Sequence, residues 1–247
     1  NLRMVGSKVT QHVRVYDSQN HLGSPTKCVV LQSTILERLT TKAAQSFICY
    51  NNIRYGYFEG KVDITGNTFD GREGALVGID LKGSSTVANI HNNFITRMGK
   101  DHHPDLTEKC IGIRVDGGSK AEITNNYIYE CRDGRSQGSN INCGMGIFVK
   151  IDTGTTIMGN IIRNCYDNTT NKIGGNSLVY APTSVNLSYN NLHGGNQVRG
   201  GVINVSGINA DSKLNSDKTL KSDSPCINKG PPDARFNDRD GSRNDIG

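Results

Sequence analysis

Three short segments of this chain carry charged or aromatic residues at alternate positions between apolar ones. They read Gly78-Ile79-Asp80-Leu81-Lys82, Gly112-Ile113-Arg114-Val115-Asp116 and Gly146-Ile147-Phe148-Val149-Lys150. Removal of a proton next to a carboxylate needs a cation that neutralises the carboxylate and a base close by. Arg114 suits the first role and Lys150 the second. These residue types predict β-elimination on a substrate that carries carboxylates.

The same three segments supply further candidate site residues. Asp80 and Asp116 offer the carboxylate oxygens that Ca²⁺ prefers, so we predict them as ligands of a Ca²⁺ ion. Lys82 adds a positive charge, and Phe148 presents an apolar face against which a sugar ring could lie. With the net charge of +5, this set predicts an acidic polysaccharide as the partner.

Long polar segments precede these strands and are expected to form a wall beside them. The segment 98–109 contains His102 and His103, which are further candidates for the catalytic base. The segment 132–144 contains Arg132 and Arg135, which we predict to bind substrate. A pair of histidines on a polar loop is more often simply solvated, and that interpretation stays open.

A second interpretation of the charged residues involves no ligand. If the segments stack in register, Lys82, Asp116 and Lys150 form a column of alternating charge, and Asp80 lies beside Arg114. Such a ladder of solvated ion pairs contributes about 0–1 kcal/mol per pair. The sequence leaves this alternative and the binding cleft open.

The elements that position these residues belong to a repeat marked by asparagine. An apolar residue is followed three places later by Asn and two places after that by another apolar residue, at intervals of 16 to 34 residues. The frames are Ile48-Asn51-Ile53, Ile64-Asn67-Phe69, Ile90-Asn93-Ile95, Ile123-Asn126-Ile128, Ile157-Asn160-Ile162 and Leu187-Asn190-Leu192. A motif that recurs at variable intervals is typical of a solenoid whose insertions form loops. Because Asn tolerates the left-handed conformation of a sharp bend, we expect these residues in such bends, stacked in one file.

Alternation of apolar and polar residues around the frames predicts strands rather than helices. With the segments of the first paragraph, each coil has three strands. In this pattern the chain resembles the right-handed parallel β-helix superfamily, the fold of pectate lyases and many other secreted polysaccharide-active proteins. The resemblance covers roughly residues 60 to 205 and implies an all-β, right-handed parallel β-helix with an Asn ladder. Upstream, Val13-Arg14-Val15 and Val30-Leu31 are candidate earlier strands.

We divide the chain into a parallel β-helix, residues 1–205, and a C-terminal capping segment, residues 206–247. The segments 220–230 and 240–247 resemble the closing segments of many secreted bacterial β-helix proteins. An uncovered last coil would offer unpaired edge groups to other chains, so a cap is expected. The start at Asn1 shows neither a signal peptide nor an N-terminal cap, so we expect a portion of something longer.

The resemblance implies a secreted or cell-surface protein, and the cleft chemistry favours a polysaccharide lyase. The Gly-His-Gly and Arg-Ile-Lys segments of the superfamily's hydrolases do not occur in the sequence, which disfavours hydrolysis. The signature strings of pectate lyases do not occur either, so the lyase prediction depends on fold and cleft chemistry. A non-catalytic carbohydrate-binding or adhesive rod, such as a cell-surface or phage-tail component, is the alternative.

The composition indicates which classes of partner to expect. The sequence has no apolar run near 18 residues, so we predict no membrane span. Basic residues are interspersed with acidic ones and no basic-aromatic recognition motif occurs, so we predict no nucleic-acid partner. We expect a monomer, with a trimer as the alternative. Among seven cysteines, Cys131 and Cys165 occupy equivalent repeat positions and are expected to stack as buried free thiols, with a disulfide as the alternative.

Overall fold

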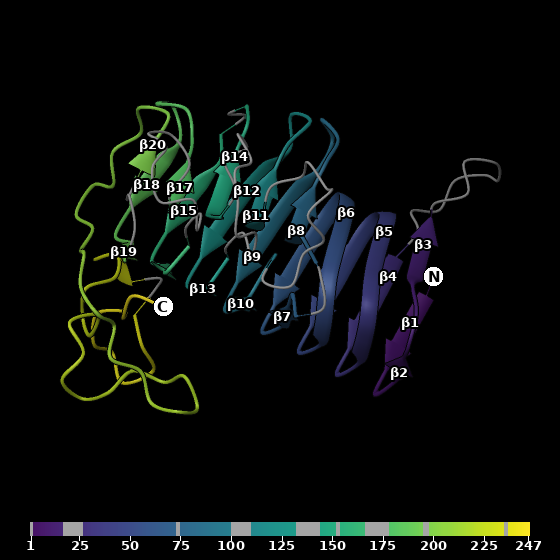
Figure 1. Ribbon diagram of the computed structural model, residues 1–247, viewed down its shortest axis with the longest axis horizontal. Coiled ribbons are helices and arrows are strands. Elements are labelled where there is room, and N and C mark those ends of the chain that lie inside the picture. The colour runs from purple at the N-terminus through teal and green to yellow at the C-terminus, as the bar shows by residue number, and fades with distance from the viewer. Residues whose placement is uncertain are drawn as a thin grey trace, which may run out of the picture.

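A computed structural model describes residues 2–16, 27–72, 75–99, 110–131, 144–151, 154–165, 178–194, 198–234 and 237–247. Within these ranges the chain is all-β and contains no α-helix, as expected from the period-two alternation. Its strands join into one curled sheet of parallel strands (Figure 1). This arrangement is compatible with a parallel β-helix.

The strand pairing sorts the strands into three columns, and β5 (Thr34–Cys49) and β6 (Asn52–Thr65) bend through all three. Column 1 also contains β3 (Val13–Tyr16), β8 (Val77–Leu81), β11 (Ile111–Val115), β14 (Met145–Val149), β17 (Val179–Tyr180) and β20 (Val198–Arg199). Column 2 also contains β1 (Leu2–Val5), β4 (Lys27–Leu31), β9 (Val87–His91), β12 (Lys120–Thr124), β15 (Thr156–Met158) and β18 (Asn186–Ser188). Column 3 also contains β2 (Lys8–Val9), β7 (Thr68–Asp70), β10 (Phe94–Thr96), β13 (Tyr127–Tyr129), β16 (Ile161–Arg163) and β19 (Asn191–His193).

The predicted repeat register is confirmed. Ile48 pairs with Ile64, and Ile64 pairs with Ile90. The interval of 16 residues is therefore one turn of chain without an insertion. The candidate strands at 13–15 and 30–31 are also confirmed, as parts of β3 and β4. The stack thus begins well upstream of residue 60.

The frame asparagines lie in a single file, as predicted. In successive frames from Asn51 to Asn190, each Nδ2 donates to the Oδ1 of the next asparagine at 2.9 to 3.0 Å. Asn204 extends the file at 3.3 Å. The left-handed residue, however, is the one before the frame asparagine, for example Asn92 or Asn125, with φ of 56° and 52°. The prediction that the frame asparagine itself is left-handed was thus wrong by one residue. The frame asparagine instead uses its side-chain amide to bond along the file.

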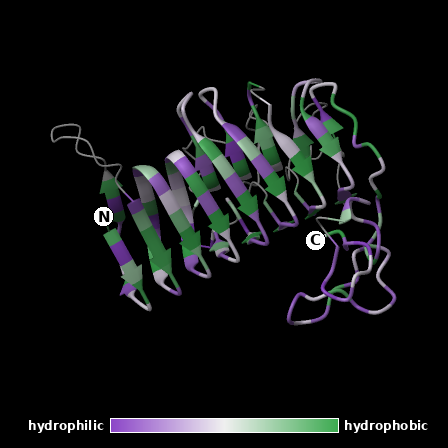
Figure 2. Ribbon diagram, turned by 180° about the vertical axis from the view of Figure 1, so that it is seen from behind, coloured by the Kyte–Doolittle hydropathy of each residue, from purple (hydrophilic) through white to green (hydrophobic). Residues whose placement is uncertain are grey.

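Inward apolar residues fill the space between the columns. Ile64, Ile90, Ile123 and Ile157 are fully buried in one continuous core. Apolar and polar bands alternate along the strands (Figure 2). Each buried isoleucine contributes about 1.5–3 kcal/mol, so stability accumulates along the stack.

Cys131 and Cys165 are buried free thiols, as predicted. The two thiols form a hydrogen bond to each other, and burial together with this contact raises the pKa of Cys131. Both side chains therefore act as apolar core residues.

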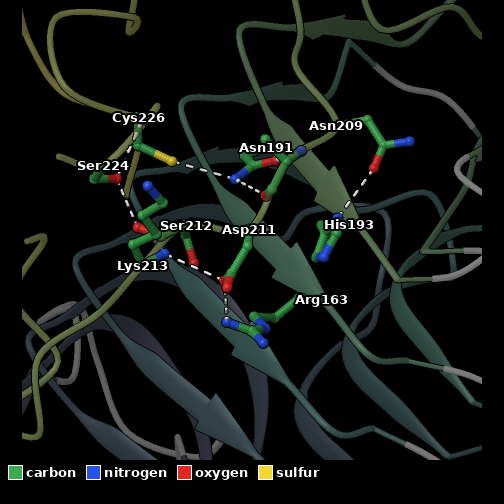
Figure 3. Close-up of polar contacts among 10 residues, drawn as sticks. Arg163, Asn191, His193, Asn209, Asp211, Ser212, Lys213, Ser224 and Cys226 are labelled. Carbon is green, nitrogen blue, oxygen red and sulfur yellow. Dashed lines mark hydrogen bonds and ion pairs between the residues drawn. The ribbon is translucent and has the colours of Figure 1, made fainter.

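The C-terminal segment folds back along the outer side of column 3. Cys226 and Ile246 pack against Ile161, an outward residue of β16. The Asp211 carboxylate lies 3.0 Å from Arg163, and the Asn191 amide donates to the Cys226 sulfur at 3.2 Å (Figure 3). These contacts fix the segment to the side of the stack. Its predicted role as a cap over the last coil stays a prediction.

Candidate functional site

The outward residues of column 1 form two files, because every second residue of a strand points to the same face. The central file contains Thr40, Tyr57, Asp80, Arg114, Phe148, Tyr180 and Arg199. The file beside it contains Lys42, Glu59, Lys82, Asp116 and Lys150. The register therefore brings together the six site residues predicted on the strands.

Asp80 and Arg114 form a two-pronged ion pair. Arg114 Nε donates to Asp80 Oδ1 at 2.8 Å, and Nη2 donates to Oδ2 at 2.6 Å. Their side chains are only 10% and 18% exposed, respectively, so the pair is mostly shielded from water. Charge-assisted pairs of this geometry are strong and directional. Asp80 thus positions the Arg114 guanidinium and offsets its charge.

Asp116 and Lys150 form a looser pair. Asp116 Oδ1 lies 3.5 Å from Lys150 Nζ and also accepts the Gly117 amide hydrogen bond at 2.7 Å. The Lys150 side chain is 59% exposed. Lys82, Asp116 and Lys150 thus stack in the register that the ladder interpretation assumes, and an ion pair joins Asp116 to Lys150.

The arrangement of Asp80 and Asp116 is a poor fit to Ca²⁺. Both oxygens of Asp80 accept hydrogen bonds from Arg114, which an ion would have to displace. Across the described parts of the chain, no group of three or more His, Cys, Asp or Glu side chains gathers in metal-binding geometry. Calcium binding by Asp80 and Asp116 stays a prediction.

A tyrosine–glutamate pair that sequence reasoning missed lies next to Asp80. Tyr57 Oη donates to Glu59 Oε1, and Lys42 Nζ lies 3.0 Å from the same carboxylate. Burial and the hydrogen bond to Glu59 raise the pKa of Tyr57. Burial opposes ionisation of Glu59, but the hydrogen bonds from Tyr57 and Lys42 outweigh it and lower the Glu59 pKa. Tyr57 therefore stays protonated at neutral pH.

A pocket of about 360 Å³ opens over this part of column 1. We call it the column 1 pocket; its polar lining comprises Arg38, Tyr55, Tyr57, Asp80, Lys82 and Arg114. Arg38 Nε is buried and has no hydrogen-bond partner among the described residues. Its guanidinium lies 5.7 Å from the centre of the Tyr55 ring. An unsatisfied cationic donor in a pocket is suited to an anionic ligand.

Sequence reasoning missed Arg38, Tyr55 and Tyr57 because it assigned no strand of column 1 between the candidate strand at 13–15 and residue 78. The interval of 16 residues between the first two frames would not have placed them correctly. Irregularities in the pairing of β5 with β6 shift the column 1 register, so that Leu39 pairs with Gly56 and Thr40 with Tyr57. A one-residue error in a strand moves every side chain to the other face.

Further along the file, Phe148 and Tyr180 stack with ring centres 5.2 Å apart and planes 25° apart. Together they provide a wider apolar surface than Phe148 alone. Arg199 follows in register, and its Nη1 is buried without a hydrogen-bond partner in the described chain. The remaining predicted site residues, His102, His103, Arg132 and Arg135, lie outside the described residues.

No protein-family model matches this chain. Neither the curated proteins nor the solved structures give a match. In the described ranges there is also no helix of the length and apolarity needed to cross a membrane. A functional conclusion must therefore come from the residues of the site.

The Tyr57–Glu59–Lys42 cluster predicts a pH-dependent contribution to stability. The folded-state pKa of Glu59 lies below its ordinary value of 4.5, so the contribution is present above that pH and is lost as the pH falls through the lowered value. Because the cluster is partly exposed, we expect at most about 1 kcal/mol. Urea unfolding of Glu59→Gln and wild type at pH 7 and pH 3 measures it. The difference should shrink at pH 3, whereas exposed Glu122→Gln should show none at either pH; a constant Glu59→Gln difference would contradict the assignment.

Proposed function

We propose that this chain is a right-handed parallel β-helix of the pectate-lyase-like superfamily, secreted or held at the cell surface. Its column 1 pocket binds an acidic, uronic-acid-containing polysaccharide and acts on it by β-elimination. One observation carries the proposal: Arg38, Lys82 and Arg114 line one pocket with Asp80, and a buried donor of Arg38 lacks a partner among the described residues.

The residues suggest how the reaction would be divided among them. Asp80 already pairs with Arg114, so Arg38 is better placed than Arg114 to receive a uronate carboxylate. Neutralising that carboxylate makes the neighbouring C–H bond more acidic. Lys150, His102 and His103 are the candidate bases. The Tyr57 hydroxyl already donates to Glu59, so its role in the pocket is to hold that carboxylate, and the departing glycosidic oxygen takes its proton from water.

The non-catalytic binder is the second candidate, and a specific observation favours it. Both strand residues predicted from sequence to be catalytic, Arg114 and Lys150, are paired with carboxylates. The column 1 pocket, together with the Phe148–Tyr180 surface, could hold an acidic glycan without cleaving it. We propose a monomer with no nucleic-acid partner in either case.

Incubation with a panel of uronic-acid polymers, with and without a chelator, tests the proposal. Wild type is expected to form unsaturated products, followed by ultraviolet absorbance. Arg38→Ala should lower kcat/KM at least about tenfold because a buried charged hydrogen bond to substrate is lost. The matched control is Lys120→Ala, an exposed residue of column 2, which should retain wild-type activity. Binding without product would identify the non-catalytic candidate, and failure to bind any acidic polymer would refute both.

A further inference from the structure

A second pocket lies on column 3, away from the column 1 pocket. Its volume is about 770 Å³, inside the range of small-molecule sites, about 300–1,000 Å³. Residues of β5, β6, β7 and β10 line it, together with Lys218 of the C-terminal segment. Lys218 stands in a turn closed by its amide hydrogen bond to the Asn215 carbonyl, within a hairpin that pairs Leu214 with Leu220.

The described lining of this column 3 pocket is strongly basic. It contains Arg54, Arg72, Arg97 and Lys218, and Asp70 is its one acidic residue. Arg97 Nε donates to Asp70 Oδ1 at 3.0 Å, and Arg72 Nε donates to Oδ2 at 2.9 Å. One carboxylate is thus shared by two guanidinium groups, so positive charge predominates. The Arg72 side chain is 62% exposed and accessible to a ligand.

Lys218 is held in place by an aromatic ring. Its Nζ lies 3.7 Å from the centre of the Phe94 ring, which itself stacks on Tyr127 with centres 5.2 Å apart. A cation over an aromatic face is attracted to it. The backbone of Lys218 has φ of +74°, a conformation in which glycine is more comfortable than lysine. The chain therefore has a lysine at a position where the backbone conformation favours glycine.

We propose that the column 3 pocket is a second binding site, for a short acidic oligosaccharide carrying carboxylate or sulfate groups. The cationic side chains would pair with those groups. Thr34, Asn52 and Thr68 line the same pocket in register beside Phe94, and their hydroxyl and amide groups suit the hydroxyls of a sugar. The site uses residues separate from the column 1 pocket, so one molecule could hold two glycan segments.

Calorimetric titration of the full chain with a uronic-acid tetrasaccharide and with a neutral tetrasaccharide tests this site. The acidic tetrasaccharide is expected to bind to the column 3 pocket. Lys218→Gly and Arg72→Ala should each weaken this affinity about fivefold to tenfold, because each removes one charged contact. Lys221→Ala, an exposed lysine of the same segment outside the pocket lining, is the matched control and should bind as wild type.

Two further measurements distinguish ligand binding at column 3 from a purely structural role of Lys218 and from binding in the column 1 pocket. Lys218→Gly relieves the positive φ, so the melting temperature of this variant should not fall although its binding weakens. A lower melting temperature with unchanged binding would mean that Lys218 is only structural. Arg38→Ala should leave binding at column 3 intact. Wild-type binding by both column 3 variants, or equal binding of the neutral ligand, would overturn the proposal whatever happens at column 1.

Discussion

Asn126→Ala is expected to lower the free energy of unfolding by about 3–5 kcal/mol, because it interrupts the asparagine file at a fully buried position. Asn126 Oδ1 accepts hydrogen bonds from both the amide N–H and the Nδ2 of Asn93, each at 3.0 Å. Its own Nδ2 donates to the Ile90 carbonyl at 2.8 Å and to Asn160 Oδ1 at 3.0 Å. Alanine leaves buried donors and acceptors of three neighbouring turns unsatisfied. Urea unfolding followed by circular dichroism measures the loss.

Asn89→Ala is the matched control. Asn89 is exposed on β9 and makes one side-chain hydrogen bond, from Nδ2 to Asp63 Oδ1 at 2.8 Å. We expect it to cost less than about 1 kcal/mol, the range of exposed polar contacts. A loss of similar size in the two variants would show that the file contributes no special stability.

Gly112→Ala is expected to destabilise the protein by about 3 kcal/mol through overpacking. An added Cβ would lie 2.6 Å from the Gly146 carbonyl oxygen and 2.7 Å from Ile128 Cγ2. The carbonyl belongs to the next strand of column 1 and cannot move without disturbing the sheet. Gly78 and Gly146 meet the same obstacle against Ile95 and Ile162, which explains why glycine precedes the charged residues in all three segments. The melting temperature and the urea midpoint report the effect.

Gly6→Ala separates crowding from backbone strain. Gly6 has φ of +59°, and a Cβ added there would have no atom within 4 Å beyond its immediate chain neighbours. The alanine variant should therefore cost only about 1–2 kcal/mol, the penalty of a left-handed non-glycine residue. If Gly112→Ala proved milder than Gly6→Ala, the close approach of the strands in column 1 would be disproved.

The strand residues of the candidate site show how far sequence reasoning reached. The alternation around Asp80, Arg114 and Phe148 placed them correctly in one file, because a strand's side-chain direction depends only on its local period. It left open which charges would pair. The two hydrogen bonds from Arg114, which engage both carboxylate oxygens of Asp80, depend on side-chain conformations in neighbouring strands.

By itself the sequence determined the repeat register, the all-β class and the buried asparagine file, since a fixed offset between Asn and apolar residues is a local pattern that recurs in every turn of chain. Only the tertiary structure decided the two pockets. Arg38 joins Arg114 across three successive strand pairings, and Lys218 reaches Phe94 because the C-terminal segment folds back over column 3. Such contacts depend on the path of the whole chain, which no local period encodes.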